Sequence, residues 1–186
     1  MLNTVALVEL IACWIAWYLA FLGPRKRAAQ YKKVTSAPSS RWGIFVMMIG
    51  FALVFAYVRP AGFEKSPLSL IASMLLGPPS VALAWSATRH LGKQWRFEAA
   101  LSEDHELIRT GPYRFVRHPI YASMLGMLLA TGLCRTWWPM FIAGLIAFLI
   151  GAEIRVRAED RLLAGRFGDT FTAYRSHVPA YIPFVH

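Results

Sequence analysis

Five long apolar stretches alternate with basic segments along the chain of 186 residues. These stretches are Thr4–Leu22, Trp42–Val58, Leu68–Ala87, Ile120–Cys134 and Trp137–Ala152. Apolar runs of about this length are typical of helices that cross a bilayer, where the backbone must satisfy its own hydrogen bonds. The pattern therefore predicts an all-α integral membrane protein with about five transmembrane helices.

The fourth and fifth stretches are separated by very few residues. The fourth is short against the ~20 residues of a full span. We therefore expect the two to form a helical hairpin that turns at Cys134-Arg135-Thr136. The first stretch lacks a basic n-region and a small-residue cleavage site, so we expect a retained span and not a signal peptide.

Beyond the fifth stretch, apolar residues recur near helical spacing with charged residues between them. These apolar residues are Ile154, Leu162, Leu163 and Phe167. The pattern predicts a helix that leaves the membrane, with Gly168 as its C-cap. Asp169 is the expected N-cap of a second short helix, which Pro179 would end.

The chain divides into two parts of different composition within one structural domain. Residues 1–88 hold the first three apolar stretches and a basic loop. Residues 89–186 hold the hairpin and the C-terminal helices, with eight of the ten acidic residues and all five histidines. Any chemistry is therefore expected in residues 89–186.

Charge and composition support the membrane assignment and predict its orientation. Mean hydropathy is +0.43 and only 16% of the residues are charged, against about 25% in soluble domains. Six of the 20 Lys and Arg residues lie in 24–41, six in 89–117 and five in 155–186, while the others are Arg59, Lys65 and Arg135. With five spans, the three large groups share one side, which the positive-inside rule makes cytoplasmic.

This orientation places the N-terminus outside and the C-terminus in the cytoplasm. The net charge of +10 is then explained by topology and by contact with anionic lipid, and no nucleic-acid partner is expected. Cys13 and Cys134 have no metal or redox spacing and are expected to pack as small apolar side chains. No metal site is expected, and the motifs of soluble nucleotide-binding and hydrolytic enzymes are missing from the sequence.

Two short segments carry the candidate chemistry. Arg155 and Glu159 are four residues apart and would share one face of a helix, either as a surface ion pair or as an anchor for a ligand. Arg117-His118-Pro119 either starts a helix with a basic flank or builds a pocket, since Tyr113 and Tyr121 lie on both sides of His118.

A third segment, His105-Glu106-Leu107-Ile108, precedes the turn signal Gly111-Pro112. By itself, this segment is better interpreted as a solvated stretch.

Together these motifs resemble a known family. "HELIRTGPYRFVRHPIY", followed about 34 residues later by "RVRAEDRLLAGRFGDTFTAYRSHVPAYIP", is similar to the isoprenylcysteine carboxyl methyltransferase family and its phospholipid-methyltransferase relatives. The resemblance covers Leu91–Pro183, about half of the chain, and no motif in the first three apolar stretches matches. It implies methyl transfer from S-adenosylmethionine within a membrane helix bundle, with the cofactor on the cytoplasmic side.

The resemblance also implies roles for individual residues. The cofactor-binding residues by motif position are His105, Leu107, Tyr113, His118, Pro119, Tyr121 and Glu159. Arg155 would bind the substrate, and Arg155 and Glu159 would be the catalytic pair. One departure is that the usual Glu-Glu pair of the family is Glu159-Asp160 in this chain.

Three hypotheses on function remain open from the sequence. The first is methylation of a lipophilic carboxylate that enters from the bilayer, as for an isoprenylcysteine; a carboxylate is ionised at pH 7 and needs no general base. The second is N-methylation of a phospholipid amine, which must remove a proton and would need a base such as Glu159 or His118. The third is a non-catalytic membrane scaffold or small transporter.

Overall fold

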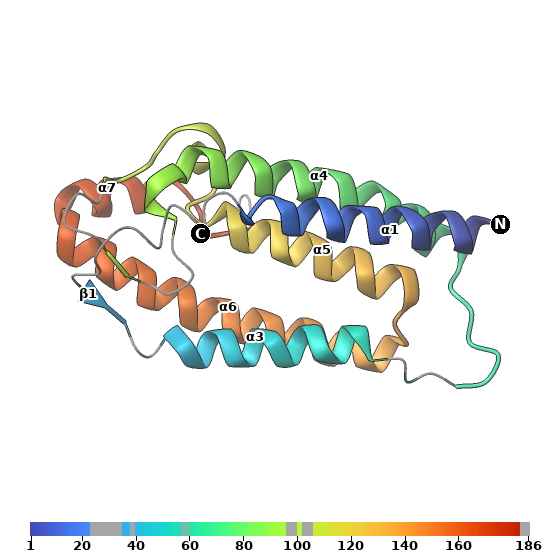
Figure 1. The fold of residues 1–186 in the computed structure, drawn as a ribbon. Helices are drawn as coiled ribbons and strands as arrows, with labels where there is room; N and C mark the ends of the chain where they lie inside the picture. The colour runs from blue at the N-terminus through green and yellow to red at the C-terminus, as the bar shows by residue number, and fades with distance from the viewer. Residues whose placement is uncertain are drawn as a thin grey trace.

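The computed structural model describes residues 1–22, 35–37, 40–56, 58, 60–95, 100–101 and 106–182. Within them, six α-helices follow one another (Figure 1): α1 (Leu2–Leu19), α3 (Ser40–Phe55), α4 (Pro67–Leu91), α5 (Pro119–Arg135), α6 (Trp138–Phe167) and α7 (Asp169–His177). The 3₁₀ turns η1 (Gly92–Gln94) and η2 (Gly111–Arg114) connect α4 to α5. Two-residue strands β1 (Thr35–Ser36) and β2 (Ala100–Leu101) pair antiparallel.

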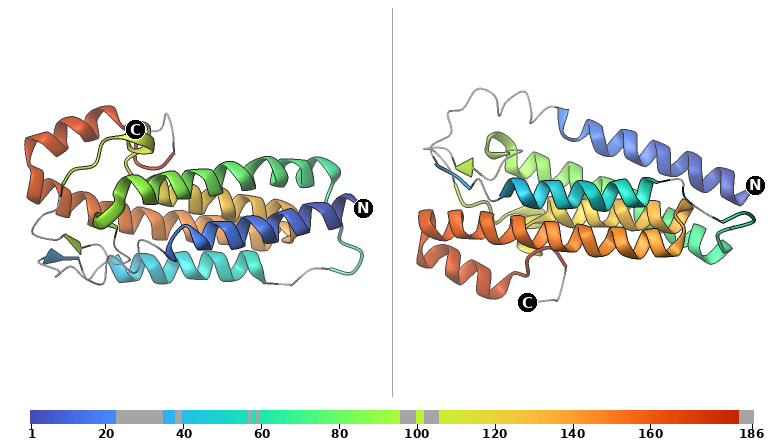
Figure 2. Two further views of the ribbon diagram at one scale, coloured as in Figure 1. Left: turned by 45° about the horizontal axis from the view of Figure 1, so that its top comes forward. Right: turned by 90° about the horizontal axis from the view of Figure 1, so that it is seen from below.

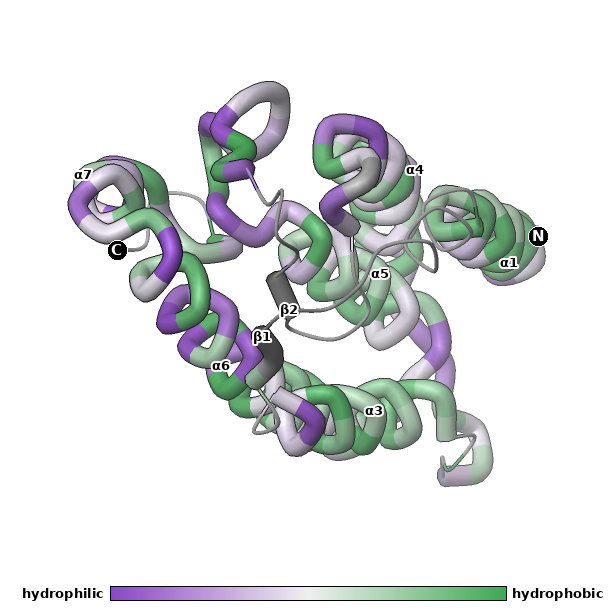
Figure 3. The backbone as a smooth tube through the Cα atoms, turned by 60° about the vertical axis from the view of Figure 1, so that its left-hand side comes forward, coloured by the Kyte–Doolittle hydropathy of each residue, from purple (hydrophilic) through white to green (hydrophobic). Residues whose placement is uncertain are grey.

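Five helices lie lengthwise in one bundle, and α7 folds back at the end opposite the N-terminus (Figures 1 and 2). Helix α3 packs along α6, while α4 packs between α1 and α5. Seen from the α7 end, the helices are mostly hydrophobic, and hydrophilic residues gather in α7, in the end of α6 and in the connections near α4 (Figure 3). The polar chemistry is therefore concentrated at one end of the bundle.

The prediction of an all-α membrane protein is confirmed at this level. Among the described residues, α1, α4 and α6 are long and apolar enough to cross a membrane, and α3 is a shorter apolar helix. The count of five spans and the orientation of the termini stay predictions. The expected boundary at residue 88 falls inside α4, and because α3 packs on α6 and α4 on α5, both parts of the chain share one core.

Helices α3 and α6 approach closely through two reciprocal pairs of glycines. A Cβ on Gly43 would lie 2.7 Å from the carbonyl oxygen of Gly151, and one on Gly50 would lie 2.7 Å from that of Gly144. Both glycine spacings are seven residues, so the pairs recur along antiparallel helices. Small residues permit this close packing where lipid removes the hydrophobic drive for helix association.

Helix α4 runs without interruption through Pro78 and Pro79. Its N-terminus is capped by the Ser66 hydroxyl, which accepts a hydrogen bond from the Ser69 backbone N–H at 3.2 Å. The hydroxyls of Ser69 and Ser73 donate to the carbonyl oxygens of Leu133 and Ala130 on α5, at 2.6 and 2.7 Å. Serine hydroxyls thus join α4 to α5 inside an apolar core.

The predicted hairpin has a tight turn, but its two helices do not pack mainly on each other. Helix α5 ends at Arg135 and α6 begins at Trp138, while the Thr136 hydroxyl donates to the Val54 carbonyl at the end of α3 at 2.6 Å. Each helix has its principal partner elsewhere, α4 for α5 and α3 for α6. The predicted tight turn is therefore present, and the two helices it joins pack mainly on other helices.

The C-terminal helices agree with their prediction except at one position. Helix α6 continues past Ala152 to Phe167, and Gly168 at φ +52° is its C-cap, where a left-handed conformation favours glycine. Asp169 is the first residue of α7 and not its N-cap, because Gly168 serves both helices. Cys13 and Cys134 are free and buried, as predicted.

Candidate active site

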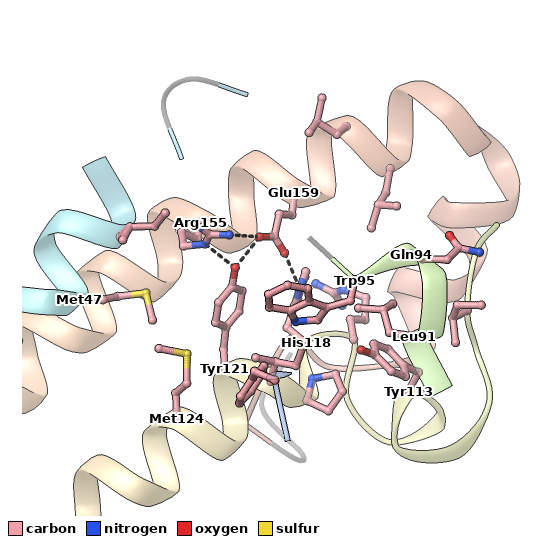
Figure 4. A pocket seen from close by; sticks show the side chains of 18 of the residues that line it. Met47, Leu91, Gln94, Trp95, Tyr113, His118, Tyr121, Met124, Arg155 and Glu159 are labelled. Carbon is pink, nitrogen blue, oxygen red and sulfur yellow. Dashed lines mark hydrogen bonds and ion pairs between the residues drawn. The ribbon is translucent and has the colours of Figure 1, made fainter. Parts of the chain in front are cut away.

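A cavity of about 670 Å³ occupies the polar end of the bundle. Its walls come from α1, α3, α5 and α6 and from the segments that connect α4 to α5. Figure 4 shows Met47 and Met124 on the side of Tyr121, with Trp95, Leu91 and Tyr113 on the side of His118. Apolar and aromatic side chains thus lie on both sides of the polar residues of the cavity.

The turn that carries Arg117 and His118 is held by the C-terminal segment. Its backbone N–H groups donate to the carbonyl oxygens of Pro179 and Ala180, at 2.9 and 2.8 Å. His118 immediately precedes α5, and Pro119 is the first residue of that helix. Proline suits this position because its missing N–H has no intrahelical acceptor there.

The carboxylate of Glu159 is the centre of a hydrogen-bonded cluster. Its Oε1 accepts from the Tyr121 hydroxyl and from Arg155 Nη2, the latter at 2.9 Å, and its Oε2 lies 3.3 Å from His118 Nδ1. Arg155 Nε donates to the Tyr121 hydroxyl at 2.5 Å. Arg155 is only 5% exposed, so the interpretation as a surface ion pair is wrong.

Asp160 is a second carboxylate of the cluster, buried in this case, which sequence reasoning did not assign to the site. It is 4% exposed, its Oδ1 lies 3.0 Å from His118 Nε2, and its Oδ2 accepts from Arg117 Nη2 at 3.0 Å. The one signal in the sequence was its adjacency to Glu159. Neighbouring helical residues point in different directions, and only the insertion of His118 between the two carboxylates brings both into one cluster.

The environment of His118 favours its charged form. Burial disfavours an imidazolium, but hydrogen bonds and opposite charge from Asp160 and Glu159 outweigh burial and raise the pKa of His118 to about 9. Its ring also stacks on that of Tyr121, with 5.7 Å between the ring centroids. These contacts therefore favour the imidazolium form of the side chain.

Most of the residues predicted from the sequence come together around the cavity. Those that line it are Leu107, Tyr113, His118, Pro119, Tyr121, Arg155 and Glu159. His105 lies outside the described residues. Close polar contacts join the side chains of Arg155, Glu159, Tyr121 and His118 into one wall of the cavity.

The apolar part of the cavity was not predicted. It includes Trp17 of α1, Phe21 just beyond that helix and Met47 of α3, from the part of the chain where no chemistry was expected. The aromatic residues of α1 recur at helical spacing, and the Trp17 and Phe21 rings pack 4.6 Å apart. This spacing was a signal, although an apolar helix gives no sign of which face lines a cavity.

Comparison with known proteins identifies the family. The profile of the isoprenylcysteine carboxyl methyltransferase (ICMT) family matches residues 70–165, about half of the chain, and the protein belongs to this family. That segment contains α5 and the Arg155–Glu159 pair and ends before the close of α6. The resemblance seen in the sequence is thereby confirmed.

Three curated proteins show similarity to the chain. The chain is 29% identical to the cobalt-zinc-cadmium resistance protein CzcN of Cupriavidus metallidurans, over 76% of this chain and 62% of that protein. It is 31% identical to the protein-S-isoprenylcysteine O-methyltransferase of Schizosaccharomyces pombe, over 45% of this chain and 36% of that protein. It is 38% identical to the methanethiol S-methyltransferase of Mycobacterium tuberculosis, over 40% and 29%. The matches span less than two thirds of each relative's length.

Proposed function

We propose that this protein is an integral membrane methyltransferase that transfers a methyl group from S-adenosylmethionine to a lipophilic, anionic acceptor. The observation that carries the proposal is the cluster of Arg155, Tyr121, Glu159 and His118 on the wall of a largely apolar cavity. Family membership supports it. Two relatives, an isoprenylcysteine O-methyltransferase and a methanethiol S-methyltransferase, also support methyl transfer.

The residues around the cavity fit the proposed cofactor. A volume of about 670 Å³ lies within the range of roughly 300–1,000 Å³ that is usual for small-molecule sites. Trp95 and Tyr113 offer aromatic surface for an adenine ring. Glu159 offers carboxylate oxygens to an ammonium or a ribose hydroxyl. When bound, S-adenosylmethionine supplies a methyl group on a positively charged sulfur, which departs as a neutral thioether.

Arg155 is suited to hold the acceptor. Its guanidinium is fixed by Tyr121 and Glu159, and it stands beside the end of the cavity where Met47 and Met124 lie (Figure 4). A guanidinium matches a carboxylate in shape and charge, while the methionines suit an apolar tail. Methyl transfer from a sulfonium to a carboxylate neutralises both charges, so an apolar, water-poor cavity favours this reaction.

The hydrogen bonding of the cluster favours an acceptor that is already anionic. N-methylation would need a base, and the two residues expected for that role are Glu159 and His118. Both His118 ring nitrogens lie against carboxylates, and Glu159 already contacts three donors. The ring nitrogens of His118 and the carboxylate oxygens of Glu159 are thus all engaged in hydrogen bonds or ion pairs. This supports a carboxylate acceptor over a phospholipid amine.

The proposed acceptor reaches the cavity from the bilayer. The cavity is lined in part by Tyr18 of α1, Leu22 just beyond α1 and Met48 of α3, whose side chains are also exposed at the protein surface. The basic residues of the polar end, including Arg109, Arg114 and Arg166, support the proposal that this end and the C-terminus face the cytoplasm.

Calorimetry with the purified protein in detergent tests the proposal. We expect wild type to bind S-adenosylmethionine, and Tyr121→Ala and Glu159→Ala to lose at least tenfold in affinity, since each removes hydrogen bonds to a charged group, worth about 1.5–3 kcal/mol. Arg157→Ala, which removes only an exposed ion pair with Glu153, should bind as wild type does. The absence of binding by wild type would favour the scaffold or transporter.

A further inference from the structure

His118 lies between two carboxylates that belong to adjacent residues of α6. Nδ1 lies 3.3 Å from Glu159 Oε2, and Nε2 lies 3.0 Å from Asp160 Oδ1. A neutral imidazole carries one N–H and one lone pair, so one of these contacts would set a lone pair against a carboxylate. Only the imidazolium, with two N–H donors, satisfies both contacts.

Asp160 also ties this turn to the C-terminal segment. Its Oδ2 accepts from Arg117 Nη2, and Nη1 of the same guanidinium donates to the carbonyl oxygens of Val178 and Arg175. Asp160 is 4% exposed and His118 is 7% exposed, so water competes little for the bond between them. Asp160 therefore contacts both the imidazole and the guanidinium that binds the C-terminal segment.

We propose that Asp160 is a positioning residue, which holds His118 as an imidazolium and, through it, fixes the carboxylate of Glu159 in the cavity. Oε2 of Glu159 lies against the Nδ1–H of His118, while Oε1 of Glu159 accepts from Tyr121 and Arg155. The order of side chains is Arg117, Asp160, His118, Glu159 and Arg155, with alternating charges. Without Asp160, the imidazole loses one of its two carboxylate partners, and Glu159 then faces a neutral ring in place of a cation over more of the pH range.

Several charged and titratable groups of the described part of the chain surround His118 and its two carboxylates. They are Glu159, Asp160 and Arg155 of α6, Tyr121 of α5, Tyr113 of η2, Arg117 of the preceding turn, and Arg175 and Tyr174 of α7. The pKa of His118 near 9 agrees with the hydrogen-bond geometry. The carboxylate with the shorter contact to the ring is Asp160, which makes it the natural target for mutation.

The test is an NMR titration of the full-length protein in detergent micelles, with histidine rings labelled with ¹³C and ¹⁵N. The His118 signals are assigned by their loss in His118→Gln. We expect wild-type His118 to keep both ring nitrogens protonated at pH 8, and Asp160→Asn to lower its titration midpoint by about one pH unit or more. Asp160→Glu, which restores a carboxylate, should keep a raised midpoint, and Glu153→Gln, an exposed carboxylate on the same helix, should change nothing.

A wild-type midpoint near 6.5, or a midpoint unchanged in Asp160→Asn, would overturn the inference. If Asp160→Asn does not fold, the ¹⁵N shifts of wild-type His118 at pH 8 still test the proposal. Shifts of a neutral tautomer of His118 would contradict it. The consequence for turnover rests on the proposed function: Asp160→Asn should lose activity at a lower pH than wild type does, while Asp160→Glu retains the wild-type profile. If wild type transfers no methyl group, the function fails, and the titration still tests Asp160.

Discussion

Arg155 and Glu159 lie one helical turn apart on α6, and they are joined at 2.9 Å in the wall of a cavity, with the Tyr121 hydroxyl bonded to both. Spacing of four residues would also suit an exposed ion pair, which contributes little. Burial of Arg155 and contact with a residue of another helix distinguish this pair from a surface pair such as Arg157–Glu153 on the same helix.

Arg155→Lys tests whether the guanidinium orients the acceptor. Lysine keeps the charge but loses the planar pair of donors, so we expect turnover to fall about 10- to 100-fold, the equivalent of one or two charge-assisted hydrogen bonds. The affinity for S-adenosylmethionine measured by calorimetry should change less than about threefold, which is a change in binding free energy of less than about 1 kcal/mol. Arg157→Lys is the matched control, and equal turnover in both variants would remove Arg155 from the mechanism.

Gly43 connects the packing of α3 on α6 to the site. A Cβ at this position would lie 2.6 Å from Cγ of Arg155 and 2.7 Å from the Gly151 carbonyl oxygen. We expect Gly43→Ala to destabilise the protein by about 1–3 kcal/mol, the usual cost of overpacking, and also to displace Arg155 and lower turnover.

Two other glycines separate these effects. Gly50→Ala meets the carbonyl oxygen of Gly144 at 2.7 Å and should cost stability with a smaller loss of turnover per folded molecule. Gly165→Ala meets nothing within 4 Å and should leave both unchanged or slightly increase stability. Thermal unfolding in detergent and methyl transfer by the folded fraction measure the two effects. Equal turnover by Gly43→Ala and Gly50→Ala would contradict the link to Arg155.

The stability of the protein should decrease with pH above neutrality because of His118. Its folded-state pKa of about 9 lies above the value of 6.5 for an unperturbed histidine. The stabilisation is therefore fully present below about pH 6.5 and is lost progressively as the pH rises to about 9. By linkage it amounts to about 3 kcal/mol.

Thermal unfolding between pH 6 and pH 9.5 measures this loss. His118→Gln should lack this component of the pH dependence, whereas His177→Gln, which changes an exposed histidine of α7, should retain it. A flat wild-type profile over this range would show that His118 is not held as an imidazolium.

Met124 tests where the apolar tail of the acceptor lies. Met124→Trp would narrow the end of the cavity beside Tyr121. Binding of a long acceptor would then become less favourable by about 1–3 kcal/mol, the usual cost of overpacking. We expect turnover of long-chain acceptors to fall about tenfold relative to short ones, with affinity for S-adenosylmethionine unchanged. Rates for a series of acceptors of increasing chain length give this ratio, and a uniform loss at all lengths would place the tail elsewhere.

Apolar patterning predicted the helices well because length and hydropathy directly limit what can cross a bilayer. It could not predict their partners. Gly43 and Gly50 repeat at seven residues, as do Gly144 and Gly151. The spacing does not indicate that the main packing partner of α6 is α3 and not α5. Helices that are apolar on all sides carry no marked face, so the contribution of Trp17 and Met47 to the cavity was not visible.

The site shows the same division between local pattern and tertiary contact. Motif spacing identified Tyr113, His118, Tyr121, Arg155 and Glu159, because each belongs to a short segment with its own pattern. The burial of Arg155 and the place of Asp160 depend on how the turn before α5 inserts against α6. That contact joins residues 42 positions apart, and a single sequence gives no signal for it.

Transfer of an isotopically labelled methyl group tests the central claim most directly. The purified protein, in lipid nanodiscs, is given methyl-labelled S-adenosylmethionine and lipophilic acceptors that end in a carboxylate, a thiol or an amine. We predict that wild type labels the carboxylate in preference to the amine, and that Glu159→Gln transfers at least tenfold less. No labelled product with wild type, or equal transfer by Glu159→Gln, would contradict the account.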